Sequence, residues 1–177
     1  MQKLVVIGAG MASGRVLEHL FEQAPDAYEV TLFNAEARGN YNRIMLSPVL
    51  SGEKSYAEIV THDDDWYNGN KVTCRFGESV VGIDRARKVV IGENDEVAYD
   101  KLLIGTGCCA PTDTIALTRA ALDAGFNQVL MLPPFYYKGV SDDGLFAAFS
   151  EVIEGVGDSR LKVYLYHFPQ MSAAPIS

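Results

Sequence analysis

The chain has 177 residues, of which 48% are hydrophobic and 21% charged, so it can bury a core as one large or two small domains and is not of the disordered class. Its formal net charge of −8 argues against non-specific binding to nucleic acid or to an anionic membrane surface. We expect no transmembrane span and no secretory signal, and the three cysteines fit a reducing cytoplasm better than a disulfide framework.

The first 33 residues predict a strand, a helix and a second strand. Residues 4–7 form an apolar run with β-branched side chains, which is typical of a strand buried on both faces of a parallel sheet. After the break at Gly8 and Gly10, apolar residues recur at helical spacing until Pro25 ends the helix. Residues 29–33 predict the second strand, so a glycine-rich turn joins the first strand to the helix.

Residues 34–104 predict polar loops followed by strands. The stretch up to residue 65 is polar and irregular, with one short helix near residues 56–60. Residues 71–76 predict a third strand, and residues 101–104 predict a fourth, buried strand. Between these two strands, short alternating stretches separated by turn residues predict a small antiparallel meander: residues 79–84, 87–92 and 96–99.

The texture of the chain changes after residue 107. A helix begins at Pro111 and ends at Gly125, and it is followed by a strand at residues 128–132. After a second helix comes a last strand at residues 161–166.

The second helix of this segment begins at Ser141, a good N-cap residue, and ends at Gly155 and Gly157. Asp142 and Asp143 lie in its first turn, where the helix dipole favours negative charge. We expect one apolar face on this helix, formed by Leu145, Phe146, Phe149, Val152 and Ile153.

The turn between the first strand and the first helix carries a variant of the dinucleotide-binding fingerprint. Gly8 permits the tight turn, Gly10 lets the backbone approach a pyrophosphate, and Ser13 is small enough to pack the helix against the strand. Met11 and Ala12 complete the turn at the helix N-terminus, where free N–H groups and the helix dipole favour a phosphate. The alternative is a plain tight turn without a ligand.

An acidic residue at the end of the second strand would hold a ribose hydroxyl in such a site. The strand ends at residues 33–34, and Glu36 lies two residues further on, so Glu36 is our candidate and Asn34 its rival. The alternative for Glu36 is a solvated loop carboxylate.

Four motifs occur in order along the first segment, namely Val6–Gly14, Tyr41–Ser47, Val80–Asp84 and Tyr99–Gly107. Together they resemble the FAD domain of pyridine-nucleotide-linked flavoprotein reductases, and in particular the flavin end of the large subunit of NAD(P)H-dependent nitrite reductase. The resemblance covers nearly all of residues 1–107 and implies an FAD-binding Rossmann segment.

The resemblance also implies further contacts with FAD. It places Arg43 at the pyrophosphate or ribityl region, Val81 at the adenine through its backbone, and the turn at Thr106 and Gly107 close to the cofactor. The alternatives are a surface charge for Arg43, a core position for Val81 and a strand-end position for Thr106. The shared order of the motifs favours the cofactor contact more for Arg43 and Thr106 than for Val81.

Two features of that family are missing. The family has a second glycine-rich motif for NAD(P)H, and this chain has none. A nitrite reductase also needs sirohaem and an iron–sulfur cluster, and Cys74, Cys108 and Cys109 cannot supply four ligands. We therefore expect no nitrite reduction by this chain.

Residues 105–177 resemble part of a different family. The motifs are residues 105–111, 132–138 and 163–169. They are similar to the third to fifth strands, with their helices, of the dihydrodipicolinate synthase / N-acetylneuraminate lyase family of (β/α)₈ barrels. The resemblance therefore implies a TIM-barrel fragment.

The chemistry of that second family is Schiff-base catalysis by a lysine, with a tyrosine that relays protons. The resemblance places Tyr166 at the catalytic tyrosine, Tyr137 at its supporting tyrosine, and Met171 where the synthases carry a carboxylate-binding arginine. The Schiff-base lysine and the relay threonine pair are missing from the matched stretch. We therefore expect no aldolase or lyase activity, and we interpret the tyrosines as packing residues.

The two segments, residues 1–107 and 108–177, keep a continuous alternation of strand and helix. Right-handed crossovers place the six main strands in the order 3-2-1-4-5-6. We expect an α/β fold, a doubly wound Rossmann-like parallel sheet with a small antiparallel meander, packed as one domain whose C-terminal strands derive from a TIM-barrel fragment. Such a join indicates a chimeric or designed protein, and a natural fusion is the alternative.

These features favour an FAD-binding module without complete parental activity. The alternatives are a designed scaffold without a ligand and a weak NAD(P)H–flavin oxidoreductase. We expect no catalytic residue and no metal site, because His19, His62 and His167 lack metal-ligand spacing. The expected partner is the dinucleotide, with no nucleic acid and no membrane, and the oligomeric state stays open.

Overall fold

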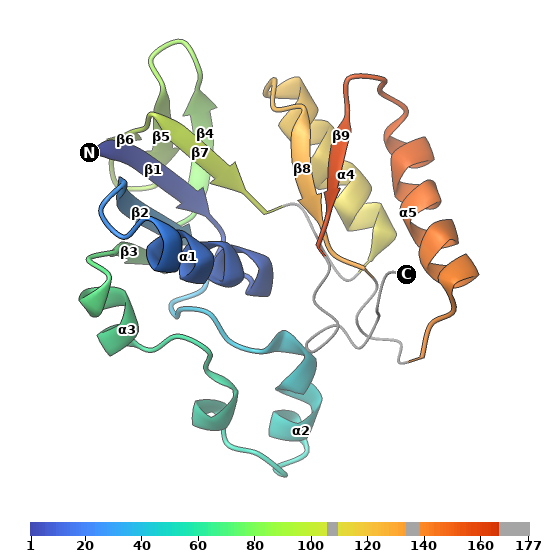
Figure 1. Cartoon of the computed structure of the whole chain (residues 1–177), viewed down its shortest axis with the longest axis horizontal. Helices are drawn as coiled ribbons and strands as arrows, with labels where there is room; N and C mark the ends of the chain where they lie inside the picture. Colours follow the sequence, from blue (N-terminus) through green and yellow to red (C-terminus); the bar gives the residue numbers. More distant parts are fainter. Residues whose placement is uncertain (106–109, 134–138, 167–177) are drawn as a thin grey trace. The chain divides into compact units, whose positions relative to one another are not determined.

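The computed structural model describes residues 1–105, 110–133 and 139–166 (Figure 1). The chain divides into two compact units, Met1–Ile104 and Gly105–Ser177, which we call unit 1 and unit 2. The boundary lies next to the Gly105–Gly107 turn, where the two sequence resemblances overlap. Within the described residues, no helix is both long enough and apolar enough to cross a membrane.

Unit 1 is built on a four-stranded parallel sheet with the strand order β3-β2-β1-β7. Its strands are β1 (Gln2–Ile7), β2 (Tyr28–Asn34), β3 (Thr73–Phe76) and β7 (Lys101–Ile104). On β1, Leu4 pairs with Val30 of β2 on one edge and with Lys101 of β7 on the other. The predicted order 3-2-1-4 is therefore present, and the apolar run of β1 is buried because it has a neighbour on each edge.

Other short elements complete unit 1. The predicted meander is a separate antiparallel sheet made of β4 (Val80–Asp84), β5 (Val89–Gly92) and β6 (Glu96–Ala98). The polar stretch between β2 and β3 contains η1 (Arg43–Met45), α2 (Leu46–Leu50), η2 (Tyr56–Ile59) and α3 (Asp64–Gly69). Helix α1 (Met11–Gln23) joins β1 to β2, as the sequence predicts.

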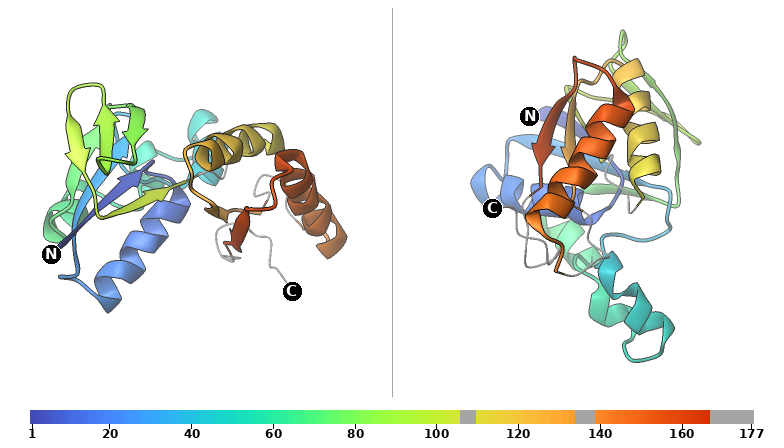
Figure 2. Two further views of the ribbon diagram at one scale, coloured as in Figure 1. Left: turned by 90° about the horizontal axis from the view of Figure 1, so that it is seen from above. Right: turned by 90° about the vertical axis from the view of Figure 1, so that its right-hand side faces the viewer.

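The two faces of the parallel sheet are covered by different elements, α1 on one side and the meander on the other (Figure 2). Successive side chains of a strand point to opposite faces. Leu4 and Val6 pack with Leu17 of α1, whereas Val5 packs with Val90 of β5. Leu17 and Val90 are both fully buried, and burial of a side chain of this size contributes roughly 1.5–3 kcal/mol.

Unit 2 has the predicted sequence of helix, strand, helix and strand. Its elements are α4 (Pro111–Asp123), β8 (Gln128–Met131), α5 (Asp142–Val156) and β9 (Lys162–Leu165). β8 and β9 pair in parallel as a two-stranded sheet of their own, and Gly105 forms a parallel bridge to Leu130. The order 3-2-1-4 is thus continuous within unit 1, while strands five and six form the separate sheet of unit 2. Packing of both units as one domain stays a prediction.

Helix α5 differs in two details from the sequence expectation. Gly155 lies inside the helix, which ends at Gly157 in the left-handed region with φ of 67°. The expected apolar face is partly wrong, because Phe146 is 75% exposed and Ile153 is 44% exposed. The buried positions follow the helical repeat on a neighbouring stripe, and they are Leu145, Phe149, Val152 and Val156.

Candidate dinucleotide site

The turn after β1 has the backbone geometry that the glycine pattern predicts. Gly8 has a φ of 96°, in the region that favours glycine because a Cβ would be strained there. Its N–H donates to the Phe33 carbonyl at 2.8 Å, which fastens the turn to the end of β2. The chain can therefore leave β1 sharply and enter α1 within three residues.

Ser13 packs beneath this turn. Its side chain is buried, and its Oγ lies 2.6 Å from the Gly8 carbonyl oxygen and 2.9 Å from the Gly10 carbonyl oxygen. The one hydroxyl proton is thus shared between the carbonyl oxygens of two peptide groups in the turn. Ala12, beside it in the first turn of α1, is also buried.

The N-terminus of α1 has no side chain of its own to cap it. Gly10 is the N-cap residue, no side-chain hydrogen bond closes the helix start, and Met11 is the first helical residue. A Cβ built on Gly10 would meet nothing within 4 Å in the described part of the chain, and the φ of −85° is open to any residue. The fold therefore does not require glycine at this position, whereas close approach of a ligand to the backbone does.

Asn34 and Glu36, the two candidates for a ribose contact, have different surroundings. Asn34 is buried, accepts a hydrogen bond from the Ala9 N–H at 3.3 Å and donates to the Arg38 carbonyl at 2.7 Å. Its amide thus ties the glycine turn to the loop after β2. Glu36 holds its carboxylate near Arg43, and of the two it is the one whose side chain is partly exposed.

Glu36, Arg43 and Tyr41 form one charged cluster. Arg43 Nη2 donates to Glu36 Oε1 at 2.6 Å, the Tyr41 hydroxyl donates to Glu36 Oε2 at 3.0 Å, and the Arg43 guanidinium lies 4.8 Å from the Tyr41 ring centroid. Burial works to raise the pKa of the Glu36 carboxyl, but the hydrogen bonds from Arg43 and Tyr41 outweigh it and lower that pKa. The structure thus brings two predicted site residues together, and Tyr41 is the partner whose role the sequence did not reveal.

Of the remaining predicted site residues, the structure describes only Val81. Val81 is on β4 in the meander sheet, at an irregular register between Val80 and Gly82, and its side chain is 64% exposed. It is therefore not the core residue of the alternative interpretation. Thr106 and Gly107 lie outside the described residues.

Sequence reasoning missed a buried polar pair beside the turn, Asn40 and Tyr67. Asn40 Nδ2 donates to the Gly10 carbonyl at 2.5 Å, and both residues are almost completely buried. The only signal in the sequence was an asparagine between Gly39 and Tyr41 in a stretch interpreted as polar loop. Burial of that asparagine depends on tertiary packing against α3, which no local pattern encodes.

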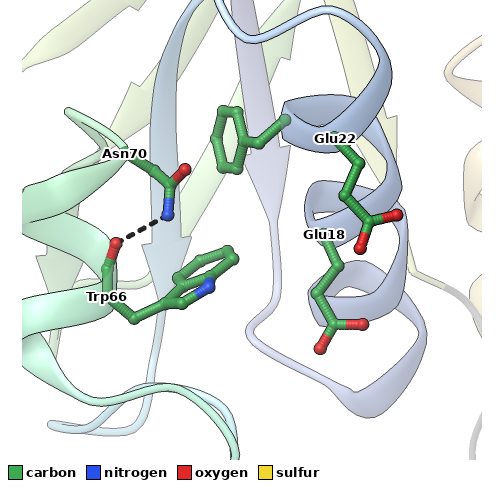
Figure 3. Close-up of a pocket in the computed structure, with 5 residues that line it drawn as sticks. Glu18, Glu22, Trp66 and Asn70 are labelled. Carbon is green, nitrogen blue, oxygen red and sulfur yellow. Dashed lines mark hydrogen bonds between the residues drawn. The ribbon is translucent and has the colours of Figure 1, made fainter.

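A separate pocket of about 230 Å³ lies between α1 and the end of α3, lined by Glu18, Phe21, Glu22, Trp66 and Asn70 (Figure 3). Glu18 pairs with Arg15 and, at 2.8 Å, with His62, while Glu22 lies 3.3 Å from His19. Both carboxylates are thus engaged within the protein. None of the predicted dinucleotide contacts lines this pocket.

Reactive side chains are few in the described part of the chain. No group of three histidine, cysteine or acidic residues there could hold a metal ion. Burial, with a smaller contribution from Asp64, raises the pKa of the Cys74 thiol to about 11, so this cysteine is a thiol at neutral pH and a poor nucleophile. Tyr166 follows β9 and donates its backbone N–H to the Met131 carbonyl at 2.8 Å, while Tyr137, His167 and Met171 lie outside the described residues.

Two kinds of curated protein are similar to this chain. Nitrite reductase [NAD(P)H] of Bacillus subtilis is 39% identical over 107 residues, which cover 60% of this chain and 13% of that protein. A protein of Chloroflexus aurantiacus described as an uncharacterized DapA-like lyase is 39% identical over 94 residues, which cover 52% of this chain and 30% of that protein. The chain therefore spans only a small part of either relative, and the two matched shares overlap because together they exceed its length.

The fold is also similar to that of a solved oxidoreductase. NADH:rubredoxin oxidoreductase from Clostridium acetobutylicum superimposes with a TM-score of 0.54 and 21% identity, over 97% of this chain and 55% of that chain. A family model described as pyridine nucleotide-disulphide oxidoreductase matches residues 2–126, more than half of the sequence. The chain therefore belongs to the pyridine nucleotide-disulphide oxidoreductase family.

Proposed function

We propose that unit 1 is an FAD-binding module. The observation that carries this proposal is the start of α1, a helix of 13 residues with a glycine at its N-cap, no side-chain cap and, among the described residues, no atom within 4 Å of a Cβ built there. The first N–H groups of a helix need acceptors, and the helix dipole makes this end favourable for an anion. A pyrophosphate supplies both the acceptor oxygens and the negative charge.

The remaining contacts follow from the resemblance and the local geometry. Glu36 would hold a ribose hydroxyl, since its carboxylate stays ionised beside Arg43. Arg43 carries the positive charge nearest to Glu36, and we assign it to the pyrophosphate or ribityl region. Val81, Thr106 and Gly107 are further assigned to FAD from the resemblance alone. When bound, FAD supplies the redox chemistry, and the residues assigned here only bind and orient it.

We further propose that the protein is a chimera, natural or designed, of a flavoprotein segment and a TIM-barrel fragment packed as one domain. Two observations support this proposal. Two unrelated kinds of relative match the chain, and the boundary between the units falls in the sequence between Ile104 and Gly105, next to the overlap of the two resemblances. In this proposal the chain carries out neither parental activity in full. We also propose that the protein is located in the cytoplasm. Weak transfer of electrons from NAD(P)H to the flavin is a second candidate, favoured by the family to which the chain belongs.

The test is an absorption spectrum of the purified protein after incubation with FAD and removal of the unbound cofactor. The proposal predicts a flavin spectrum at one FAD per chain, and FAD as the nucleotide released on denaturation. Addition of NADH under anaerobic conditions then distinguishes the candidates, because bleaching of the flavin supports an oxidoreductase. A protein that retains no flavin would contradict the proposal and leave a scaffold without a ligand.

A further inference from the structure

We propose that Asn40, held in place by Tyr67, is a positioning residue that fixes the Gly10–Met11 peptide for a pyrophosphate. The inference rests on the proposed dinucleotide function and adds two residues to it. Neither residue belongs to the fingerprint, and both lie beyond β2 in the sequence.

Asn40 is fully enclosed between the glycine turn and α3. Its side-chain Nδ2 donates to the Gly10 carbonyl at 2.5 Å, and its backbone N–H donates to the Tyr67 hydroxyl oxygen at 2.9 Å. The Tyr67 hydroxyl in turn donates to Asn40 Oδ1. Asn40 is 1% exposed and Tyr67 is 2% exposed, so water does not compete for these bonds.

Tyr67 determines which end of the Asn40 amide faces the turn. An asparagine amide has one accepting and one donating end, and rotation by half a turn exchanges them. Because the phenol donates to Oδ1, the NH₂ group must face Gly10. Burial raises the pKa of Tyr67 to about 12, so its hydroxyl keeps the proton that it donates.

The bond to the Gly10 carbonyl orients the N–H on the other side of the same peptide. A trans peptide is planar, and its C=O and N–H point in opposite directions. The Gly10 oxygen accepts from Asn40, from the Ser13 hydroxyl at 2.9 Å and from the Gly14 N–H at 3.1 Å, and fixing it in this way fixes the Met11 N–H at the helix start. Hydrogen bonds to the carbonyl also polarise the peptide, which makes that N–H a stronger donor to an anion.

Two glycines leave the space that this pair occupies. A Cβ on Gly14 of α1 would lie 2.9 Å from Asn40 Nδ2, and a Cβ on Gly39 would lie 2.6 Å from Cε2 and 2.8 Å from the hydroxyl oxygen of Tyr67. The fold thus reserves room for these two polar side chains directly beneath the turn. A buried polar pair that only filled space would be replaceable by apolar residues, whereas in this pair the Asn40 NH₂ group donates to the turn.

The experiment compares wild type with Asn40→Asp, Tyr67→Phe and the control Asn70→Asp. Asn40→Asp keeps the shape and the bond from Tyr67 but turns a carboxylate oxygen toward the Gly10 carbonyl. Asn70 Nδ2 also donates to a backbone carbonyl, that of Trp66 at 2.8 Å, but at the end of α3 (Figure 3). The dissociation constants of FAD, ADP and adenosine are measured for each, together with thermal unfolding of the free protein.

We expect Asn40→Asp to weaken the binding of FAD and of ADP by tenfold or more. Tyr67→Phe should weaken it by about threefold to tenfold, and Asn70→Asp by less than about twofold. The affinity for adenosine, which has no phosphate, should change little. A purely structural defect would weaken the binding of all three ligands alike. Where Asn40→Asp does not fold, the ADP and adenosine affinities of Tyr67→Phe decide between these outcomes. Unchanged binding of ADP in the folded variants, or equal losses for ADP and adenosine, would overturn the inference alone. A wild-type protein that binds neither FAD nor ADP would overturn the proposed function, and this inference with it.

Discussion

The helices α1 of unit 1 and α5 of unit 2 begin in opposite ways. At α5, the Ser141 side chain accepts a hydrogen bond from the Gly144 N–H, and Asp142 and Asp143 add negative charge to the first turn. At α1, a glycine stands at the same position, no side chain caps the helix and no acidic residue lies in the first turn. The chain itself supplies an acceptor for the first N–H groups of α5, whereas those of α1 need an acceptor from outside the helix. We therefore expect an anion to bind at the start of α1 rather than at the start of α5.

The largest effect should come from filling the space at the open helix start. Gly10→Ala places a methyl group where the pyrophosphate would approach, and this overpacking should cost about 1–3 kcal/mol of binding energy, roughly a 5- to 160-fold loss of FAD affinity. Because nothing described lies within 4 Å of that Cβ, the thermal midpoint of the free protein should hardly move. The measurement is a titration with FAD.

Gly69→Ala is the matched control for that variant, since its Cβ would also meet no described atom within 4 Å. It lies at the end of α3, away from the turn, and should leave FAD affinity unchanged. Equal affinities of Gly10→Ala and Gly69→Ala would place the pyrophosphate elsewhere.

The next effect should be a loss of stability that is largest in unit 1. In Gly14→Ala the new methyl group would stand 2.9 Å from Asn40 Nδ2 and 3.0 Å from His62 Cε1, and both buried side chains are held by hydrogen bonds. We expect a net destabilisation of about 1–2 kcal/mol, after the helix-propensity gain of alanine over glycine. Denaturant unfolding followed through the fluorescence of Trp66, the single tryptophan, measures it. A rise in stability would mean that Asn40 and His62 can move aside.

Removing the side-chain cap of α5 should act mainly on unit 2. Ser141→Ala loses the hydrogen bond to the Gly144 N–H and should lower the stability of unit 2 by about 1 kcal/mol. Hydrogen exchange of the α5 amides should become faster, while FAD affinity stays at the wild-type value. If the variant lost FAD affinity instead, the start of α5 would also contribute to FAD binding, and the difference between the two helix starts would not explain where FAD binds.

The smallest effect concerns pH and the pocket side of α1. Burial works to raise the pKa of the Glu18 carboxyl, but hydrogen bonds from Arg15 and His62 outweigh it and lower that pKa below its ordinary value of 4.5. The stabilisation from ionised Glu18 is therefore complete above that ordinary value and is lost as the pH falls through the lower folded value. Glu18→Gln should reduce stability at neutral pH by less than about 1 kcal/mol, and the difference from wild type should shrink as the pH falls below the ordinary pKa of 4.5 and through the lower folded value. A constant difference across this range would show that the ion pairs contribute nothing.

Local pattern predicted the order of elements well in both units. The strand of residues 4–7, the turn at Gly8 and the cap at Ser141 depend on residues that are neighbours in sequence, and the structure confirms each of them. The exposed positions of Phe146 and Ile153 were missed because several apolar residues in α5 compete for one buried stripe. Which stripe of α5 becomes buried depends on the neighbouring elements of unit 2, and the local sequence pattern does not determine how those elements pack.

The candidate site was predicted less completely than the fold. Gly10 and Ser13 follow from a motif, but the pairing of Glu36 with Arg43 and the enclosure of Asn40 by Tyr67 join residues across loops. Such contacts are set by the packing of α3 and of the loop after β2, and the sequence offers only polar residues without a period. The pairing of β8 with β9 in a sheet of their own is a similar long-range choice.

Unfolding of the whole chain with and without FAD tests the central claim most directly, with hydrogen exchange measured at the amides of α1 and α5 at the same time. A ligand that binds the folded site stabilises it by mass action, in proportion to the logarithm of its concentration over the dissociation constant. We predict that FAD raises the midpoint of the unfolding transition reported by Trp66 and slows hydrogen exchange in α1 more than in α5. No change in either helix, or protection of α5 alone, would contradict it.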